Sequence, residues 1–446
     1  MIILDIRIPS YVNTALTLLA SSGYEAYIVG GCVRDAFLDK TPYDWDITTS
    51  AKPNETLNVF SAFRTVETGL KHGTVTVIID GSPLEITTMR VDGEYSDNRH
   101  PDSVDFTENI ILDLSRRDFT VNAMAYNPEI GLCDPFRGKE DLKNGIIKCV
   151  GEPKKRFTED ALRIIRGIRF SSVLGFEIEE KTSAEIVNLK QLLLNVAAER
   201  KRVELLKLLC GKDAKRILLS YPQVIFEIIP ELAPMYKFPQ NTPYHIYDVW
   251  EHTAAAVENV PPEPVYRMAM LLHDAGKPQA FYADSDGTAH FKGHQQISYE
   301  IAVKVLTDLR FSKAETEEIS KLVLYHDFHP TGERAETLLT ASQTGADFLK
   351  RLYPVLIADA KAQNPVNLDI TLEKIAESEK ILDEAVENRE CLSVKQLAVN
   401  GRDIEKLGFD GKRIGEILQW LLVQVITGNV KNEKDEIIDI IRNRRI

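Results

Sequence analysis

The spacing of apolar residues changes near residue 158, and this change limits the folds that the chain can adopt. Between residues 24 and 90, short apolar runs such as YEAYIVGG and GTVTVIID alternate with turn residues, which predicts strands and a helix or two. From Thr158 onward the apolar positions recur at helical spacing, as at Leu162, Ile165 and Ile168. We therefore predict an α+β chain with an N-terminal mixed α/β head and helices throughout the rest.

The length of the chain predicts several folding units. At 446 residues it exceeds what one hydrophobic core usually serves. A proline cluster at 238–245 favours a break between helical units there. We divide the chain into a head (1–150), a helical neck and body (151–240), a third helical domain (241–380) and a helical tail (381–446).

Charge and hydropathy narrow the class of function. No stretch approaches the roughly 18 uncharged apolar residues of a membrane span, so we expect a cytoplasmic protein without a membrane partner. Five scattered cysteines without a CxxC pair favour reduced, structural thiols. The net charge of −13 repels a polyanion overall, so nucleic acid would have to bind local basic stretches such as GEPKKRF, RIIRGIRF and ERKRVELLK.

The segment YIVGGCVRDAFLDKTPYDWDI combines two features that suit a nucleoside triphosphate. The pair Gly30 and Gly31 after an apolar run lets the backbone approach a ligand, and amides at a helix start suit phosphates. Asp44 and Asp46 are two positions apart, so on a strand both carboxylates face one way and can hold two divalent cations. A glycine turn or a solvated DxD loop is common alone, whereas the two in this order predict nucleotidyl transfer.

This segment resembles the signature of the class II tRNA nucleotidyltransferase and bacterial poly(A) polymerase superfamily. Further blocks are similar in family order, among them LEITTMRVDGEYSDNRHPDSVDF, LSRRDFTVNAMAYNP and RFTEDALRIIRGIRFSSVLGF. The resemblance implies addition of CCA to the 3′ end of tRNA from CTP and ATP, with Mg²⁺ as the cofactor on Asp44 and Asp46. Glu85 could be a third carboxylate near the metals or a structural partner.

The resemblance also implies a set of nucleotide-binding residues. Arginine and amide side chains offer fixed donors to phosphates and ribose. These residues are Gly30, Gly31, Arg34, Arg116, Arg117, Asp118, Asn122, Asp160, Arg163 and Arg166.

Asp160 and Arg163 are three apart, so in a helix they would face one way. An acceptor beside a donor can read the edge of cytosine or adenine, and in the family the similar E-D-x-x-R block replaces a nucleic-acid template. Arg166 lies nearby in sequence. An ordinary i,i+3 surface salt bridge is the alternative interpretation.

Two segments distinguish a CCA-adding enzyme from a poly(A) polymerase within the superfamily. The block at 68–74 resembles the CCA-adding type. The segment at 89–106, rich in Gly, Asp and Asn, resembles the mobile loop used to switch from C to A addition, with Asn98 and His100 where relatives more often have Gly and Arg. An A-only enzyme and a poly(A) polymerase remain alternatives.

Seven of the nine histidines lie between His245 and His329. Imidazole with carboxylate suits a transition metal, and we predict one held by residues from several helices. The pattern resembles an HD-type phosphohydrolase domain and implies cleavage of a phosphoester, with Lys277 as a phosphate contact or a plain helix-end charge. The ligands predicted are His252, His273, Asp274, His294, His326 and Asp359.

The stretch GFDGKRIG in the tail predicts a helix start near Lys412 and Arg413, either a contact to the tRNA backbone or a structural brace. Two alternatives come from other classes. One is an HD phosphohydrolase whose N-terminal half only senses nucleotide or binds RNA, and the presence of both Asp44 and Asp46 argues against it. The other is a pure RNA-binding module, which would need neither the carboxylates nor the clustered histidines.

Overall fold

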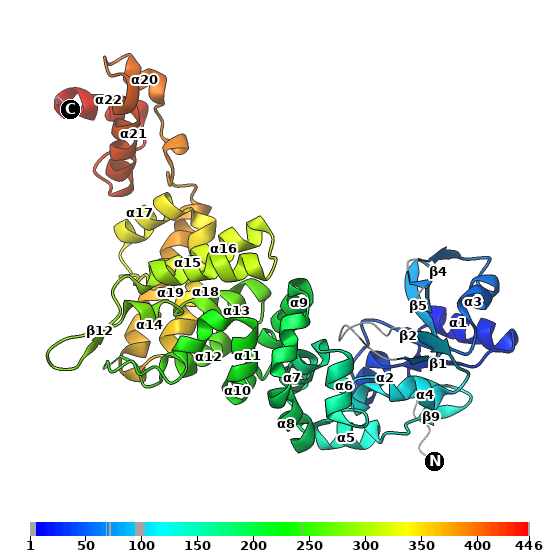
Figure 1. Cartoon of the computed structure of the whole chain (residues 1–446). Coiled ribbons are helices and arrows are strands. Elements are labelled where there is room, and N and C mark those ends of the chain that lie inside the picture. Colours follow the sequence, from blue (N-terminus) through cyan, green and yellow to red (C-terminus); the bar gives the residue numbers. More distant parts are fainter. Residues whose placement is uncertain (1–5, 68, 71–72, 94–102, 243, 445–446) are drawn as a thin grey trace. The chain divides into compact units, whose positions relative to one another are not determined.

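The protein was analysed as a computed structural model that describes residues 6–67, 69–70, 73–93, 103–242 and 244–444 (Figure 1). The chain divides into two compact units, one up to Ala233 and one from Pro234 onward. Asn98 and His100, on which the choice of branch partly rests, lie outside the described residues, as do residues 68, 71 and 72 of the 68–74 block.

The head is built on a seven-stranded mixed sheet with strand order β3-β4-β5-β2-β1-β8-β9. β2 and β5 are parallel and the neighbouring pairs are antiparallel. The head elements are α1 (Ser10–Ser21), β1 (Ala26–Val29), α2 (Gly31–Phe37), β2 (Asp46–Thr49), α3 (Pro53–Val59), β3 (Arg64–Val66), β4 (Thr74–Ile79), β5 (Ser82–Thr88), β6 (Arg90–Asp92), β7 (Val104–Phe106), α4 (Ile110–Ser115), β8 (Ala125–Asn127), β9 (Gly131–Cys133) and α5 (Gly138–Asn144).

Alternating burial explains why these segments form a sheet with helices packed on it. Along β4, every second side chain is buried, so one face of the strand joins the core. The helices α1 and α3 contact the strands and each other, as Figure 1 shows beside β4 and β5. The strands β8 and β9 extend the sheet beyond the region in which the sequence predicted strands.

The neck is helical except for one short strand. β10 (Ile146–Ile147) pairs in parallel with β11 (Glu177–Ile178), so the prediction of helices alone after residue 158 was wrong at this point. The helices are α6 (Pro153–Glu159), α7 (Leu162–Leu174), α8 (Glu180–Asn188), α9 (Ala198–Leu209), α10 (Ala214–Ser220) and α11 (Pro222–Ile228).

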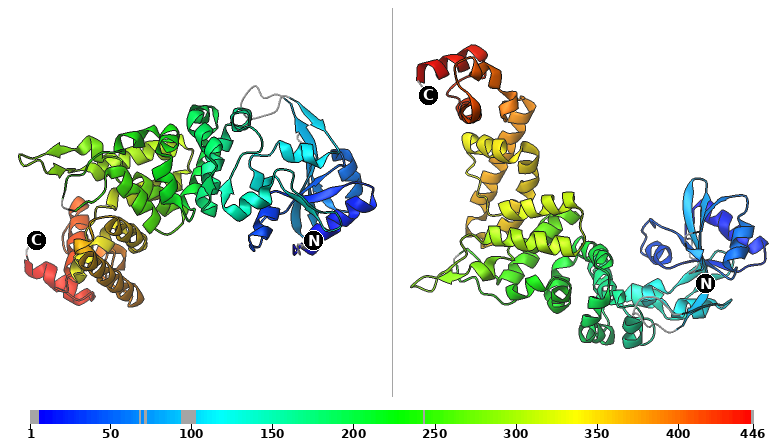
Figure 2. Two further views of the ribbon diagram at one scale, coloured as in Figure 1. Left: turned by 90° about the horizontal axis from the view of Figure 1, so that it is seen from below. Right: turned by 45° about the horizontal axis from the view of Figure 1, so that its top comes forward.

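The second unit begins with a helical domain that carries one small hairpin. β12 (Tyr282–Ala283) and β13 (Ala289–His290) pair antiparallel and project from the helices in both views of Figure 2. The helices are α12 (Val249–Asn259), α13 (Pro264–Leu272), α14 (Lys277–Ala280), α15 (His294–Asp308), α16 (Lys313–Tyr325), α17 (Arg334–Thr344), α18 (Ala346–Lys361) and α19 (Leu368–Glu387).

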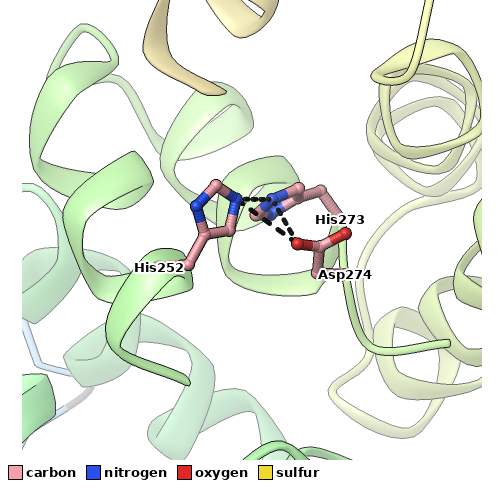
Figure 3. Close-up of side chains that lie close together, drawn as sticks. All are labelled: His252, His273 and Asp274. Carbon is pink, nitrogen blue, oxygen red and sulfur yellow. Dashed lines mark hydrogen bonds and ion pairs between the residues drawn. The ribbon is translucent and has the colours of Figure 1, made fainter. Parts of the chain in front are cut away.

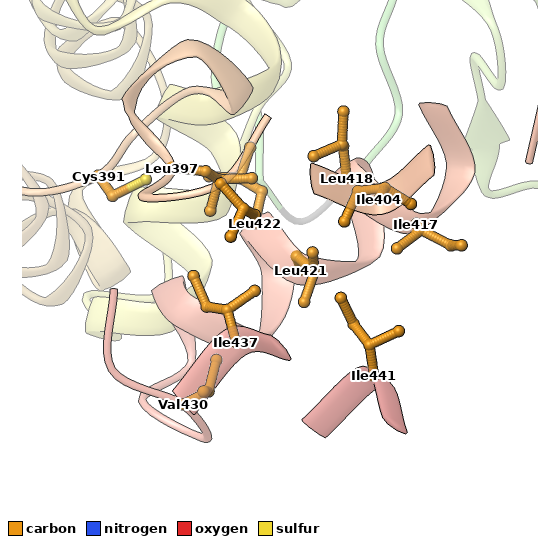
Figure 4. Close-up of a cluster of buried hydrophobic side chains, with 11 residues drawn as sticks. Cys391, Leu397, Ile404, Ile417, Leu418, Leu421, Leu422, Val430, Ile437 and Ile441 are labelled. Atoms are coloured by element: carbon orange, nitrogen blue, oxygen red, sulfur yellow. The ribbon is translucent and has the colours of Figure 1, made fainter. Parts of the chain in front are cut away.

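The tail has a hydrophobic core of its own. α20 (Gly401–Glu405), α21 (Gly411–Ile426) and α22 (Lys434–Arg444) enclose buried side chains that include Ile404, Leu421 and Ile437 (Figure 4). Because this core starts at Cys391, the tail begins after α19, whereas the predicted boundary at residue 380 falls inside that helix. α21 starts at Gly411, as GFDGKRIG predicted.

The α+β class predicted from the sequence is confirmed. No helix in the described ranges is long and apolar enough to span a bilayer. All five cysteines are free thiols.

Candidate active site and second metal centre

Three carboxylates lie close together where β2 begins. Asp44 and Asp46 are exposed on either side of the buried Trp45, so both project from one face, as their spacing predicted. Asp46 opens β2 and stands in register with Glu85, which lies within the parallel strand β5. The sheet therefore brings Glu85 beside the aspartates, although Asp46 and Glu85 are 39 positions apart in the sequence.

The electrostatics of this cluster suit a cation. The pKa of Asp46 is raised to about 6, first by loss of solvation and then by the negative charges of Glu85 and Asp44, while Arg117 acts in the opposite direction. Like charges crowded on neighbouring strands repel one another, and a divalent cation removes that repulsion. The carboxylates present thus fit a site for hard divalent cations.

The glycine turn lies next to this cluster. Gly30 has a φ of 82° and precedes α2, a conformation that few other residues adopt. A Cβ at Gly30 would lie 3.2 Å from Nη1 of Arg117, so the turn and this guanidinium are close neighbours. Arg34 donates through Nη1 to Oδ1 of Asn122 at 2.6 Å, which joins the start of α2 to the RRDFTVNA block.

Asp118 forms an ion pair with Arg166 in which two guanidinium nitrogens donate to one carboxylate oxygen. Oδ2 of Asp118 accepts from Nε of Arg166 at 2.9 Å and from Nη2 at 2.6 Å, and Oδ1 accepts from Asn122. Burial alone would raise the pKa of Asp118, but Arg166 outweighs it and lowers the pKa to about 2. The pair joins the head to α7, which also carries the predicted selecting residue Arg163.

Replacement of Asp118 by asparagine should destabilise the first unit in a pH-dependent way. A folded-state pKa below the unfolded value adds stability above that unfolded value, and the gain is lost as the pH falls toward 2. We expect a loss of about 2 kcal/mol at pH 7 in urea unfolding, which shrinks below about pH 4. Asp308→Asn, at an exposed pair with Lys304, is the control and should change little. A difference that stays constant with pH would contradict the assignment.

Asp160 and Arg163 do not share a helix as predicted. Asp160 lies between α6 and α7 with extended backbone, and its Oδ1 accepts from the N–H of Leu162 at 3.1 Å, because α7 needs an acceptor where it begins. Its Oδ2 lies 3.3 Å from Nη2 of Arg200. Arg163 pairs with Glu159 at 2.9 Å, so the alternative of an Asp160–Arg163 salt bridge is not formed either.

Four histidines and two aspartates of the second unit meet in one buried cluster. His252 Nε2 lies 3.2 Å from His273 Nε2, and His294 Nε2 lies 3.1 Å from His326 Nε2. Asp359 Oδ1 lies 2.9 Å from His252 Nε2. The six predicted ligands come from α12, α15, α18 and the ends of α13 and α16, and Figure 3 shows three of them.

The backbone fixes which nitrogen of each imidazole faces inward. The Nδ1 atoms of His252, His273, His294 and His326 each meet a carbonyl oxygen, at 2.7 to 3.1 Å. A carbonyl only accepts, so each Nδ1 carries a proton, and in the neutral imidazole the inward-facing Nε2 has a free lone pair. Neutral imidazoles whose Nε2 lone pairs face each other about 3 Å apart repel unless a metal ion or a proton lies between them. The lone pair of a neutral imidazole is also what histidine donates to a metal.

Asp274 stands at the centre of this cluster. Its Oδ2 faces His252 and His273 at 3.3 and 3.2 Å, whereas its Oδ1 faces His294 and His326 at 3.4 and 3.5 Å. These contacts form two possible ligand triads that share Asp274. Both carboxylate oxygens are buried, so the charge that they carry is costly unless cations lie beside them.

The side chain of Lys277 is directed into the histidine–aspartate cluster and not toward solvent. It is buried, and Nζ lies 2.7 Å from Asp274 Oδ2 and donates to Gln240 Oε1 at 2.8 Å, with His245 Nε2 at 3.3 Å. Three acceptors match the three N–H bonds of an ammonium. The sequence offered a phosphate contact or a helix-end charge for Lys277. In the structure its ammonium instead lies against Asp274 and offsets the charge of that carboxylate.

The sheet and carboxylates of the head define a nucleotidyltransferase. Residues 26–148 match the model of the poly A polymerase head domain. Residues 175–235 match a probable RNA and SrmB-binding site of polymerase A, and residues 289–441 match a putative domain 2 of tRNA nucleotidyltransferase.

Curated relatives and solved structures narrow this class. The chain is 32% identical to the CCA-adding enzyme of Lactobacillus helveticus over 427 residues, covering 95% of the chain and 94% of the relative. It is 35% identical to that of Geobacillus sp. over 435 residues, covering 96% and 95%. The CCA-adding enzyme of Bacillus stearothermophilus in complex with CTP has a TM-score of 0.73 at 26% identity, with 98% of each chain covered. The chain belongs to the family of CCA-adding enzymes, which are tRNA nucleotidyltransferases.

Proposed function

We propose that this chain adds C, C and A in turn to the 3′ end of tRNA, from CTP and ATP, and releases pyrophosphate at each step. Family membership supports the reaction. The observation that carries the proposal for the site is the register of Asp46 with Glu85, which gathers three carboxylates beside the glycine turn. With tRNA and nucleotides as partners, we expect the protein to act in the cytoplasm.

In this proposal Asp44 and Asp46 hold two Mg²⁺ ions. When bound, the ions supply positive charge that favours ionisation of the RNA 3′-hydroxyl and departure of pyrophosphate. Glu85 adds negative charge beside Asp46 and raises its affinity for the cations. The turn at Gly30 and Gly31 and the guanidinium of Arg117 bind the triphosphate, and Arg34 with Asn122 contacts phosphate or ribose. Positioning of the two substrates supplies much of the rate.

Selection of the nucleotide is assigned to Asp160 and Arg163, with Arg166 beside them. The carboxylate of Asp160 offers acceptors. The guanidinium of Arg163 donates to Glu159 and to two backbone oxygens, and its Nε–H and second Nη2–H are left to donate to the edge of cytosine or adenine. The contact of Asp160 with Arg200 is long, at 3.3 Å, so a base edge can replace it at small cost.

Replacement of Asp160 by alanine should therefore relax selection. We expect the preference for CTP and ATP over UTP and GTP to fall by roughly tenfold to a hundredfold, since a bidentate base contact is worth about 1–3 kcal/mol. Rates of single addition with each nucleotide measure this. The control is Arg200→Ala, which removes the partner of Asp160 but keeps its carboxylate and should leave the preference unchanged. Unaltered discrimination in Asp160→Ala would contradict the assignment.

The reaction itself is tested with tRNA transcripts that end before CCA, after the first C and after CC. With CTP and ATP supplied separately, a CCA-adding enzyme extends the first two with CTP and the third with ATP. An A-only enzyme extends only the third, and a poly(A) polymerase adds a long adenylate tail. A protein that only senses nucleotide extends none of them.

The buried histidine cluster favours a second function. We propose that the cluster would hold divalent transition-metal ions through two ligand sets that share Asp274, one with His252 and His273 beside Asp359 and the other with His294 and His326. The observation that carries it is the pair of buried Asp274 oxygens, each facing its own two imidazoles. When bound, the metal would supply positive charge that makes water a better nucleophile toward phosphorus. In hydrolysis of a 2′,3′-cyclic phosphate, the water oxygen would form a bond to phosphorus, one P–O bond to the ribose would break, and the released ribose oxygen would take up the proton that water loses.

A further inference from the structure

A cavity of about 340 Å³, called the Tyr244 cavity below, lies between the end of α18, the start of α19 and the segment that holds Tyr244. The chain reverses there in a short turn, Pro365–Asn367, because Oδ1 of Asn364 accepts from the N–H of Val366 at 3.2 Å. The N–H of Asn364 donates to the backbone oxygen of Tyr244 at 2.8 Å, which ties two walls of the cavity together. Its volume lies in the range of small-molecule sites.

Two of these walls also touch the histidine–aspartate cluster. Gln363, which lines the cavity, donates through Nε2 to Oδ2 of Asp359 at 2.8 Å. His245 follows Tyr244 in the chain, and its ring centroid lies 5.2 Å from that of His252. A molecule in the Tyr244 cavity would therefore lie beside the ligand set that includes His252 and Asp359.

The lining of the cavity differs in kind from the cluster beside it. The described residues that line it are uncharged, and they include the amides of Gln363 and Asn367 and the hydroxyl of Thr371. Tyr244 is 61% exposed and Val366 is 79% exposed. Single exposed apolar residues are common on protein surfaces, but here two of them line one cavity together with amides. An open aromatic ring beside amides suits a nucleobase, which stacks through its face and bonds at its edge.

Charge divides a phosphorylated nucleoside between the two sites. Bound cations would attract a phosphate to the cluster, whereas an uncharged cavity gives a phosphate no such attraction. One ribose joins the base of a nucleotide to its phosphate. Adjacent sites of these two kinds could thus hold the two ends of one molecule, and a phosphoester without a base would use the cluster alone.

We propose that the Tyr244 cavity binds the base of a ribonucleoside 2′,3′-cyclic phosphate whose phosphate lies at the histidine–aspartate cluster. Tyr244 stacks on the base, and Gln363 and Asn367 bond to its edge. The chemistry is the same whether the nucleoside is a free nucleotide or the last residue of an RNA chain. The proposal rests on the second function proposed above, because the cluster has to bind the phosphate.

Hydrolysis of two cyclic phosphates tests this division. Adenosine 2′,3′-cyclic phosphate carries a base, and cyclic glycerol phosphate carries none. In Tyr244→Ala the ratio of kcat/KM for the first to that for the second should fall by roughly tenfold to a hundredfold, which is the worth of stacking a base on an aromatic ring. Tyr244→Phe keeps the ring and should restore the ratio. A ratio that stays native in Tyr244→Ala would overturn the proposal.

Two further variants make the result independent of the segment beside His245. Thr371→Trp fills the cavity from α19, and the same ratio should fall at least about tenfold because the base loses its place on the ring. Tyr282→Ala removes an exposed tyrosine that stacks on His290 in the hairpin, and the ratio should stay native. An equal fall in Tyr282→Ala and Tyr244→Ala would contradict a site at the cavity.

A tRNA transcript that ends in a 2′,3′-cyclic phosphate distinguishes the two sources of the nucleoside. A higher kcat/KM than that of the mononucleotide identifies an RNA end, and a lower one identifies the free nucleotide. With the preferred substrate, Tyr244→Ala should again lower kcat/KM by about tenfold or more. A native value in that variant would overturn the proposal for either source.

A binding measurement separates the cavity from the hydrolytic function. An azidoadenosine 2′-phosphate should photolabel peptides that contain Tyr244 or Thr371, and Thr371→Trp should prevent this labelling. If the unaltered chain is labelled there but hydrolyses neither cyclic phosphate, the hydrolytic function is wrong and the nucleoside site is upheld. Labelling that misses both peptides would overturn the nucleoside site, whatever the hydrolysis shows.

Discussion

Asp46→Asn should reduce the rate of nucleotide addition at least about a thousandfold, which corresponds to about 4 kcal/mol of transition-state stabilisation. The amide keeps the shape of the side chain but loses the charge that would bind a divalent cation. Rapid-quench measurements on a tRNA transcript lacking CCA, at saturating CTP and Mg²⁺, give the rate. Asp44→Asn should have an effect of similar size, and Glu85→Gln a smaller one.

The same variant should fold at least as stably as the unaltered protein when metal is absent. Because the folded state raises the pKa of Asp46 to about 6, this group makes the metal-free protein less stable as the pH rises from about 4 through 6. Asparagine removes that penalty. Thermal unfolding in EDTA should therefore favour Asp46→Asn at pH 7.5 and show little difference at pH 4. A variant that loses both activity and stability at pH 7.5 would point to a structural role instead.

Asp274→Asn should release the metal of the second unit and abolish its phosphoesterase activity. It removes the one carboxylate whose two oxygens face both pairs of imidazoles, so neither triad stays complete. Elemental analysis should give two transition-metal ions in the unaltered chain and none in the variant. A 2′,3′-cyclic phosphate is the substrate to test.

Two controls separate the centres. His329→Ala removes an exposed histidine outside the cluster and should change neither metal content nor hydrolysis. Asp46→Asn should keep the metal of the second unit, while Asp274→Asn should still extend tRNA. Equal metal content in Asp274→Asn and the unaltered chain would show that the cluster is not a metal centre.

Local patterns were enough to predict the parts of the site that lie within one strand or one turn. The alternation around Trp45 placed Asp44 and Asp46 on one face, and the spacing of histidines predicted a cluster that the structure brings together. The first prediction rests on the geometry of three consecutive residues. The second rests on a residue type that is seldom concentrated in one part of a sequence unless it has a function.

Features that depend on pairing between distant segments were not accessible in this way. The neighbourhood of Asp46 and Glu85 follows from the parallel pairing of β2 with β5, which no spacing reveals. The ion pair of Asp118 with Arg166 likewise joins residues 48 positions apart. A buried charge shows its role only through its partners.

The break between α6 and α7 was missed for a related reason. The apolar spacing of Leu162, Ile165 and Ile168 fits a helix, but it does not mark where that helix begins. Asp160 is an acceptor of the kind that starts helices, since its side chain binds the N–H of Leu162. Had Asp160 been interpreted as the residue that caps the start of α7, the sequence would have predicted that Asp160 lies before the helix that carries Arg163.

Asp46→Cys tests most directly whether the head carboxylates bind the catalytic cations. A thiolate binds Mg²⁺ poorly and softer ions well, so the ratio of the tRNA extension rate in Cd²⁺ to that in Mg²⁺ should rise at least about tenfold over the ratio for the unaltered protein. A ratio that does not change, or a native rate in Mg²⁺, would mean that Asp46 is not a metal ligand.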